Sequence, residues 1–239
     1  MPEAPEFEVG VRNKIHTENV MRVVMLGKPG SGKGTQAKRL AARLSIPAIS
    51  TGDLIRSAVS TGSELGVKFA SYSSRGLLVP DELVLELVRV RMAQGDCQRG
   101  FVLDGFPRTV AQADELGALL GRQGVSLDRA MYLEVEDQIL VERASGRRYC
   151  PRDGRGYHVT FAPAKIVGIC DECGGDLAQR DDDRVEVVQA RLKEYDLKTA
   201  PLLGYYARTG IRRDVVGVGT PEEVEARLFA SLNGVMKNV

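Results

Sequence analysis

The sequence has no tryptophan, only two histidines and an aromatic content of just 5%. It lacks an apolar run of the roughly 18 residues that a membrane-spanning helix needs, and it lacks the apolar stretch of a secretory signal. It also has no excess of either charge, because 33 basic and 32 acidic side chains leave a net charge of +1. This balance excludes attraction to nucleic acid or to membranes through overall charge. We therefore expect a cytoplasmic protein, without nucleic-acid or membrane partners, that works through specific sites.

Cysteine is scarce as well, with four residues in the chain. Three of them, Cys150, Cys170 and Cys173, fall within one short window, and Cys97 stands alone. In a cytoplasmic chain of this length such a cluster favours metal ligation over disulfides. Cys97 is expected to be a small buried hydrophobic residue.

The rest of the composition is that of one globular domain with insertions, since 43% of the 239 residues are hydrophobic and 27% are charged. From Met21 onward, short apolar runs alternate with helical periods, which is typical of βα units in a parallel sheet covered by helices. Five strands are expected, in the runs MRVVML, PAIS, FVLD, AMYLEV and DVVGVG. Thr220, Pro221 and Glu223 predict a capped helix start after the last strand. Residues 51–79 and 146–183 break the alternation and are expected to be insertions, and residues 1–20 a leader or tag.

The first strand runs into a glycine-rich loop, Gly27 to Thr35, and then into a helix, which is the context of a phosphate-binding loop. Glycines allow successive backbone N–H groups to point at a phosphate, and the helix N-terminus adds positive potential. Lys33 is placed to reach the outer phosphates. The general motif has Ser or Thr directly after this lysine, whereas here Gly34 follows it and the hydroxyl comes one position later, at Thr35.

Four runs, GKPGSGKGTQ, STGDLIR, GFVLDGFPRT and TAPLLGYY, occur in this order, and with them residues 21–239 resemble the long-lid adenylate kinases. The resemblance implies a three-layer α/β P-loop nucleoside monophosphate kinase fold with a five-stranded parallel sheet. It also implies a monomeric enzyme that transfers a phosphoryl group reversibly from Mg-ATP to AMP, giving two ADP. The implied core comprises residues 21–50, 80–145 and 184–239, with an AMP-binding segment at 51–79 and a lid at 146–183.

The resemblance also implies roles for individual residues. Phosphoryl transfer needs fixed cations more than a nucleophile, and arginine binds phosphate oxygens bidentately. The implied catalytic cations are Lys33, Arg108, Arg143, Arg147, Arg180 and Arg191. The implied ATP contacts are Gly30, Ser31, Gly32, Lys33, Gly34, Thr35, Arg143, Arg147, Tyr157, His158 and Pro221. The implied AMP contacts are Thr51, Gly52, Arg56, Leu77, Leu78, Val79, Gly105, Phe106, Pro107, Arg108, Gln112, Arg180 and Arg191, with Gln112 reading the adenine edge. Asp104 and Thr35 are expected to hold Mg²⁺ through water.

The implied lid carries a C-x2-D pair at Cys150 and Asp153 and a C-x2-C pair at Cys170 and Cys173. Three thiolates and one carboxylate suit tetrahedral Zn²⁺, and a closed site of four ligands is structural rather than catalytic. His158 and Asp171 are rival fourth ligands, but the resemblance gives His158 a position facing the nucleotide. A disulfide is the alternative to metal.

Two other functions compete with this interpretation. One is a nucleoside monophosphate kinase with GMP, UMP or CMP as acceptor, or with GTP as donor; Gln112 favours adenine, and the guanine motif N/T-K-x-D is not found. The other is a nucleotide-binding module without catalysis.

Overall fold

The computed structural model describes residues 20–62, 64–73 and 80–232. The expected leader lies outside these residues except for Val20, and so do Leu77, Leu78 and Val79 of the expected AMP segment. Among the helices of the described ranges, none is long and apolar enough to cross a membrane.

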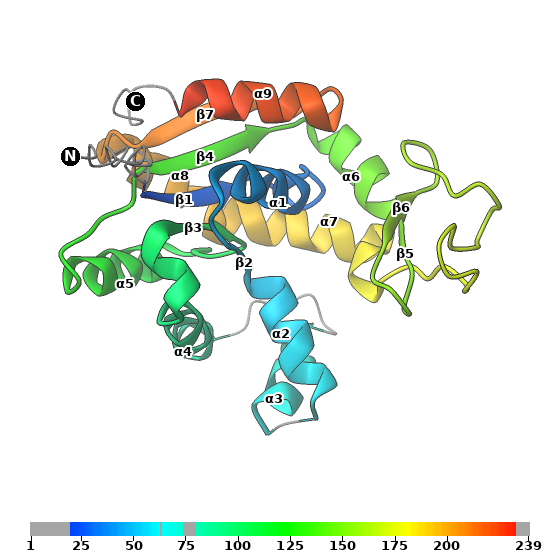
Figure 1. Cartoon of the computed structure of the whole chain (residues 1–239), viewed down its shortest axis with the longest axis horizontal. Helices are drawn as coiled ribbons and strands as arrows, with labels where there is room; N and C mark the ends of the chain where they lie inside the picture. Colours follow the sequence, from blue (N-terminus) through cyan, green and yellow to red (C-terminus); the bar gives the residue numbers. More distant parts are fainter. Residues whose placement is uncertain (1–19, 63, 74–79, 233–239) are drawn as a thin grey trace, which may run out of the picture.

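A five-stranded parallel sheet forms the centre of the protein, in the order β2-β3-β1-β4-β7 (Figure 1). Its strands are β1 (Met21–Leu26), β2 (Ala48–Ser50), β3 (Gly100–Asp104), β4 (Arg129–Glu134) and β7 (Arg212–Val216). The predicted five-stranded parallel sheet is therefore confirmed. Parallel strands buried on both faces read as continuous apolar runs, which is why these segments stand out in the sequence.

The alternation of side chains along β1 divides the core into two halves. Met21, Val23 and Met25 face one side, where they pack against α1 (Lys33–Leu44) and α9 (Pro221–Ser231). Val24 and Leu26 face the other side. In Figure 1, α9 lies along the top above β7, and α1 is drawn lower, at the level of β1.

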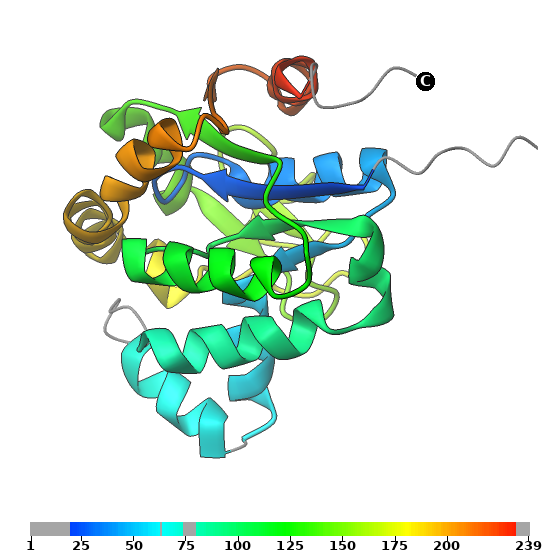
Figure 2. The same cartoon turned by 90° about the vertical axis from the view of Figure 1, so that its left-hand side faces the viewer.

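The second layer covers the opposite face of the sheet, as the rotated view in Figure 2 shows. It contains α4 (Asp81–Met92), α5 (Val110–Gly121) and α8 (Pro201–Arg208), whose buried side chains share one apolar cluster with β1 and β3. A third apolar cluster joins α6 (Asp137–Ser145) to α7 (Val185–Glu194). The remaining elements are the 3₁₀ turns η1 (Gly95–Arg99) and η2 (Asp181–Asp183) and the π-helical turn η3 (Tyr195–Thr199).

Two insertions project from this core (Figure 1). The first contains α2 (Thr51–Ser60) and α3 (Glu64–Ser73) and follows edge strand β2. The second contains β5 (Arg147–Tyr149) and β6 (Gly156–His158), which pair as a separate antiparallel sheet that the sequence patterns did not predict. The expected boundaries fall between elements. The AMP-binding role of the first insertion and the lid role of the second stay predictions, and "lid" is used below only as a name for residues 146–183.

The predicted start of α9 is confirmed. The Thr220 hydroxyl accepts the Glu223 N–H at 3.2 Å, the Glu223 carboxylate accepts the Thr220 N–H at 2.9 Å, and Pro221 occupies the first turn. The three residues thus satisfy the helix N-terminus in the way that their order in the sequence indicates.

Candidate active site

The phosphate-binding loop lies at the carboxyl end of β1, beside the end of β3. Ligands of open α/β sheets bind in the crevice at this edge. Gly32 takes the left-handed conformation directly before α1, with φ of 92°, where a side chain would be strained. The loop therefore presents the N-terminus of α1 to this crevice, as the sequence predicted.

Lys33 points its ammonium group back into the loop, and Nζ donates a hydrogen bond to the Lys28 carbonyl at 3.0 Å. Burial lowers the pKa of Lys33 to about 8. The Asp104 carboxylate opposes this shift, while the positive charges of Arg108, Arg191 and Arg147 add to it. One lysine and three arginines thus lie close enough to repel each other.

Gly34 stands where the general phosphate-loop motif has Ser or Thr, and the space around it gives a steric reason for this difference. A Cβ atom on Gly34 would lie 3.1 Å from Oδ2 of Asp104. This is tighter than ordinary van der Waals contact, so Ser or Thr at this position would press on the carboxylate. The glycine leaves room for the Asp104 side chain beside the first turn of α1.

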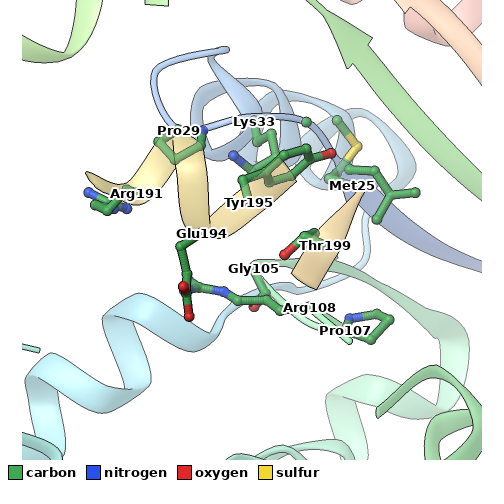
Figure 3. Close-up of a pocket in the computed structure, with 12 residues that line it drawn as sticks. Met25, Pro29, Lys33, Gly105, Pro107, Arg108, Arg191, Glu194, Tyr195 and Thr199 are labelled. Atoms are coloured by element: carbon green, nitrogen blue, oxygen red, sulfur yellow. The ribbon is translucent and has the colours of Figure 1, made fainter. Parts of the chain in front are cut away.

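A pocket lies beneath the loop (Figure 3). It is lined by Met25, Leu26, Gly27, Pro29, Lys33, Gly105, Pro107, Arg108, Arg191, Glu194, Tyr195 and Thr199. Burial and the positive charge of the neighbouring Arg191 lower the pKa of Arg108 to about 10. Nε of Arg108 donates to the Gly105 carbonyl at 2.8 Å, which fixes the guanidinium in the pocket. The structure therefore brings together two predicted arginines that are far apart in the sequence.

Arg147 and Arg191 are each paired with an aspartate of η2. Arg147 at the start of the lid contacts Asp183 at 3.0 Å, and Arg191 of α7 contacts Asp182 at the same distance. Asp183 is buried, and burial raises the pKa of its carboxyl group. These carboxylates hold the two guanidinium groups at the junction between lid and core.

Arg143 and Arg180 have other partners. Arg143 donates to the Gly217 carbonyl at 2.9 Å, which ties α6 to the segment after β7. The guanidinium of Arg180 lies 5.3 Å from the ring centroid of Tyr149. The first contact places Arg143 near the expected adenine site, whereas the second holds Arg180 against β5 within the second insertion.

The expected AMP contacts gather around the ends of β2 and β3. Thr51 is buried, and its hydroxyl lies 3.4 Å from the Asp104 carbonyl. Arg56 forms an ion pair with Asp53 on the same helix. Gln112, also buried, bonds to Asp81 and to the backbone of Arg108. Thr51 and Gln112 therefore flank the same crevice, and Arg56 follows one turn into α2.

Near the expected adenine site, the Pro221 carbonyl accepts a hydrogen bond from Nε2 of Gln36 at 2.9 Å. Gln36 lies in the first turns of α1 and is buried. The bond joins the phosphate loop helix to the first residue of α9. Nothing in the sequence singles out Gln36, because a polar residue three positions after the lysine is ordinary in a surface helix.

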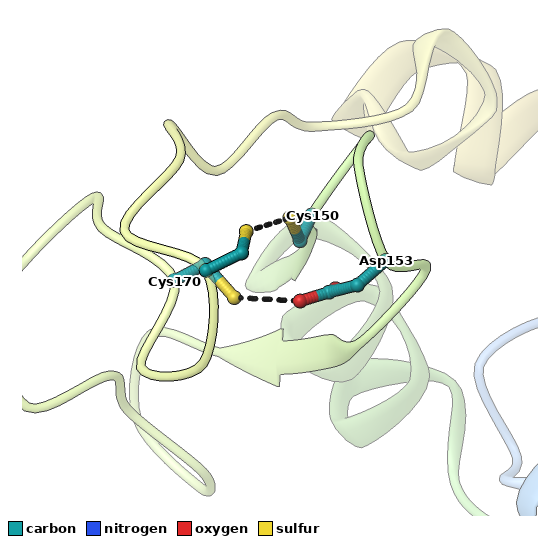
Figure 4. Close-up of side chains that lie close together, drawn as sticks. Cys150, Asp153 and Cys170 are labelled. Carbon is teal, nitrogen blue, oxygen red and sulfur yellow. Dashed lines mark hydrogen bonds between the residues drawn. The ribbon is translucent and has the colours of Figure 1, made fainter.

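The metal-ligand candidates converge in the lid (Figure 4). One ligand atom from each of Cys150, Asp153, Cys170 and Cys173 lies within 4.8 Å of the others. The Sγ atoms of Cys150 and Cys173 are 3.3 Å apart, and Sγ of Cys170 is 3.2 Å from Oδ2 of Asp153. All four cysteines of the chain are free, so the alternative of a disulfide is wrong for this structure.

Two turns of the same geometry present these ligands. In each turn the first cysteine accepts the N–H of a glycine four positions later and donates its own N–H to the carbonyl five positions later. The two glycines, Gly154 and Gly174, have φ of 74° and 65°. Asp153 also accepts the N–H of Arg155 at 2.9 Å, and this bond lowers the pKa of the Asp153 carboxyl group to about 2. The carboxylate is therefore ionised and ready to bind a cation.

The rival ligands lie outside this group. Nδ1 of His158 accepts the N–H groups of Thr160 and Phe161, at 3.0 and 3.1 Å. Asp171 accepts the N–H of Lys165 at 2.9 Å. A Cβ atom on Gly146 would overlap the His158 ring at 2.3 Å, so this histidine packs on the chain where the lid begins.

Tyr157 occupies a different place from the one its expected ATP contact would suggest. Its ring is buried in the lid, with the hydroxyl 3.4 Å from Sγ of Cys170 and 2.8 Å from the Asp171 N–H, whose hydrogen bond it accepts. Burial and this sulfur contact raise the pKa of the hydroxyl. In this conformation Tyr157 supports the cysteine group, and a contact with ATP stays a prediction.

Sequence reasoning missed a further residue of the loop, Lys28. Its ammonium group contacts Asp137 at 2.8 Å and Asp196 at 3.0 Å. These carboxylates belong to α6 and to η3, so Lys28 joins the phosphate loop to two other elements. Its position inside the glycine-rich motif was a signal, but its partners lie more than 100 residues away.

Comparison with known proteins agrees with this geometry. A family model described as adenylate kinase matches residues 25–211. An adenylate kinase of Geobacter sp. (strain M21) is 50% identical over 212 residues, which are 89% of this chain and 99% of that protein. One of Thermodesulfovibrio yellowstonii has the same identity over the same shares. One of Lachnoclostridium phytofermentans is 48% identical over 219 residues, 92% of this chain and 99% of the relative.

Proposed function

The chain belongs to the adenylate kinase family, and from that premise we propose that its crevice transfers a phosphoryl group reversibly from Mg-ATP to AMP, giving two ADP. The observation that carries the proposal is the convergence of Lys33, Arg108 and Arg191 on one pocket at the carboxyl edge of the sheet. Such a set of cations is unfavourable without an anion and favourable around a polyphosphate.

The roles of these residues follow from their positions. The N–H groups of the loop and Lys33 hold the outer phosphates of ATP, while Arg108 and Arg191 neutralise the phosphate of AMP and the group in transfer. Arg147 joins Arg108 and Arg191 when its guanidinium releases Asp183 and binds phosphate instead. Fixed cations stabilise the charge of the transition state, and the opposed positions of the two phosphates provide the in-line geometry.

Asp104 is the proposed site for Mg²⁺, held through water. Its carboxylate lies beside Gly34 and close enough to Lys33 to oppose the lowered pKa of the lysine. Mg²⁺ keeps most of its waters and uses few protein carboxylates, so one aspartate at this edge suits it. When bound with ATP, the ion supplies neutralisation of phosphate charge.

An acceptor screen tests the function. Purified protein should form ADP from ATP with AMP as acceptor, and much more slowly with GMP, CMP or UMP. Rapid turnover of another acceptor would support the alternative kinase. Nucleotide binding without turnover of any acceptor would support a binding module.

We also propose that Cys150, Asp153, Cys170 and Cys173 hold a structural Zn²⁺. Around a tetrahedral ion with Zn–S bonds of about 2.3 Å, neighbouring ligand atoms are about 3.8 Å apart. The Sγ atoms of Cys150 and Cys173 are 3.3 Å apart, within about 0.5 Å of this spacing, so a small separation of the two thiolates would admit the ion. The apolar cluster of the lid consists of few residues, so a metal would contribute much of its stability.

Elemental analysis tests this assignment. Protein purified without chelators should contain about one zinc per chain, and Asp153→Ala should lower its zinc affinity. Zinc-free protein would contradict the proposal. The same would follow if Asp171→Ala lowered the affinity and Asp153→Ala did not.

The AMP-binding role of residues 51–79, the lid role of residues 146–183 and a monomeric state belong to the same proposal. So does a cytoplasmic location. The projection of both insertions beside the crevice supports the two binding roles (Figure 1).

A further inference from the structure

The side-chain amide of Gln112 is held from two sides. Its Oε1 accepts the backbone N–H of Arg108 at 2.7 Å, and its Nε2 donates to Oδ1 of Asp81 at 2.6 Å. Gln112 lies in the first turn of α5 and is only 2% exposed. Asp81 is the first residue of α4, so the amide bridges two helices.

These partners determine which way the amide points. A backbone N–H can only donate, and an ionised carboxylate can only accept. The atom that faces Arg108 must therefore be the oxygen, and the atom that faces Asp81 must be the nitrogen. A flipped amide would oppose donor to donor and acceptor to acceptor, and it would lose both hydrogen bonds.

The second oxygen of Asp81 is also held. Oδ2 accepts the hydroxyl of Thr109 at 2.8 Å, and Thr109 in turn caps α5 by accepting the N–H of Gln112 at 3.2 Å. Both carboxylate oxygens are thus tied to α5. Asp81 cannot turn away from Gln112 without breaking the contact with the helix cap.

An amide has two N–H donors and two acceptor sites on its oxygen. The contacts with Asp81 and Arg108 use one of each, and the described residues provide no third bond to this amide. One donor and one acceptor are left, on an amide of fixed orientation. An adenine edge offers the complement, an amino donor beside a ring-nitrogen acceptor, whereas a 6-oxopurine presents an acceptor in place of the amino group.

We propose that Asp81 is a positioning residue for base selectivity: it fixes the Gln112 amide in the orientation that accepts a 6-amino group and rejects a 6-oxo group. This role rests on the proposed function, in which Gln112 reads the base of AMP. Sites that orient a hydrogen-bonding group reject the wrong partner because the buried group is then left unpaired.

The test compares AMP with inosine monophosphate, which has oxygen in place of the 6-amino group. Asp81→Ala should lower the ratio of kcat/KM for AMP to kcat/KM for inosine monophosphate about tenfold, since the charge-assisted hydrogen bond that fixes the amide is lost. The isosteric Asp81→Asn should lower it less, because its amide oxygen can still accept from Nε2 of Gln112. The fall should arise from the AMP value, with KM for ATP unchanged. Glu82→Gln is the matched control, because it removes a negative charge from the same helical turn at an exposed site, and its ratio should equal that of the parent.

Equal loss of activity with both acceptors would overturn the proposal and make Asp81 a scaffold residue only. A measurement on the parent chain is independent of how the variants fold: the side-chain N–H₂ group of Gln112 should exchange with solvent much more slowly than that of exposed Gln123. Equal exchange rates would also overturn the proposal. Absence of AMP turnover by the parent would instead overturn the proposed function, so the two failures are distinguishable.

Discussion

Lys33 combines a positive charge with surroundings that favour its loss. Its pKa of about 8 in the folded protein lies below the ordinary 10.5, because of burial and neighbouring arginines. Between these two pH values the unfolded chain binds more protons than the folded one at this group. The contribution of Lys33 to the free energy of unfolding therefore rises with pH across this window, and its charge disfavours folding below pH 8. Nucleotide phosphates would neutralise this charge and remove the disadvantage. The unfavourable burial of the Lys33 charge therefore favours nucleotide binding.

This gives a prediction for catalysis. The value of kcat/KM for ATP reports the protonation of the free enzyme, so it should fall as pH rises through about 8. The limb in kcat should lie at higher pH, because bound phosphates stabilise the ammonium group. Initial rates between pH 6 and 10 measure both profiles. In Lys33→Arg the limb near pH 8 should disappear, and a limb that persists in this variant would assign it to another group.

Single residues also show where sequence reasoning was sufficient. The P-loop lysine, the capping box of α9 and the four ligand candidates of the lid were predictable, because each depends on spacing within a few residues. Tyr157 was different: the family resemblance implies an ATP contact, which stays a prediction, and local spacing does not indicate that its hydroxyl lies 3.4 Å from Sγ of Cys170 in the other turn. Contacts between turns that are far apart in the sequence depend on the tertiary structure, which the spacing of residues within one turn does not predict.

At the scale of secondary structure, Lys28 connects three elements. Its side chain is 19% exposed and contacts Asp137 at the start of α6 and Asp196 in η3. Its carbonyl accepts the Lys33 ammonium group. π-Helical turns are frequent at functional sites, and this one turns Tyr195 and Thr199 toward the pocket. Lys28 therefore holds the loop against α6, which carries Arg143, and against η3, which directly follows α7.

We expect Lys28→Met to raise KM for ATP about fivefold, since two partly exposed ion pairs contribute roughly 0.2–1 kcal/mol each. KM for AMP should change much less. Lys38→Met is the control, because Lys38 is exposed on α1 and approaches a carboxylate only at 4.0 Å. Steady-state kinetics at low and high salt measure the effect. Equal changes in both variants would mean that net charge, rather than the contact with α6 and η3, sets the affinity.

The lid gives a second prediction at this scale. If zinc stabilises the two cysteine turns, its removal by a chelator should unfold residues 146–183 first and lower the melting temperature of the whole protein. Hydrogen exchange should show faster exchange at Tyr157 and Ile169, with unchanged protection in β1 and β3. Uniform loss of protection would contradict a metal that acts within the lid.

The central sheet could be predicted at this scale, whereas the short strands β5 and β6 and the π-helical turn could not. Apolar runs with turn signals identified all five parallel strands because both faces of the sheet are buried. The short strands β5 and β6 have three residues each and half-exposed patterns, so periodicity could not separate them from loops. The π-helical turn likewise has no periodic signature in five residues.

The whole molecule has two insertions beside one crevice, and its cationic groups are paired with aspartates at the junction of lid and core. Arg147 contacts Asp183, and Arg191 contacts Asp182. Phosphate would compete for both arginines, and a ligand that binds the resulting arrangement better shifts the population toward it. Closure over the nucleotides would also exclude water, which could otherwise accept the phosphoryl group.

Labels at exposed positions 60 and 160, attached by chemistry that spares the lid thiols, test this closure, since one lies at the end of α2 and the other in the lid. A bisubstrate nucleotide inhibitor should shorten the distance between them. Labels at positions 115 and 222, both in the core, should keep theirs. In Arg147→Met the shortening should need more inhibitor, because one of the groups that draw the lid to phosphate is missing. An unchanged distance between positions 60 and 160 at saturating inhibitor would mean that the crevice binds its nucleotides without moving the two insertions together.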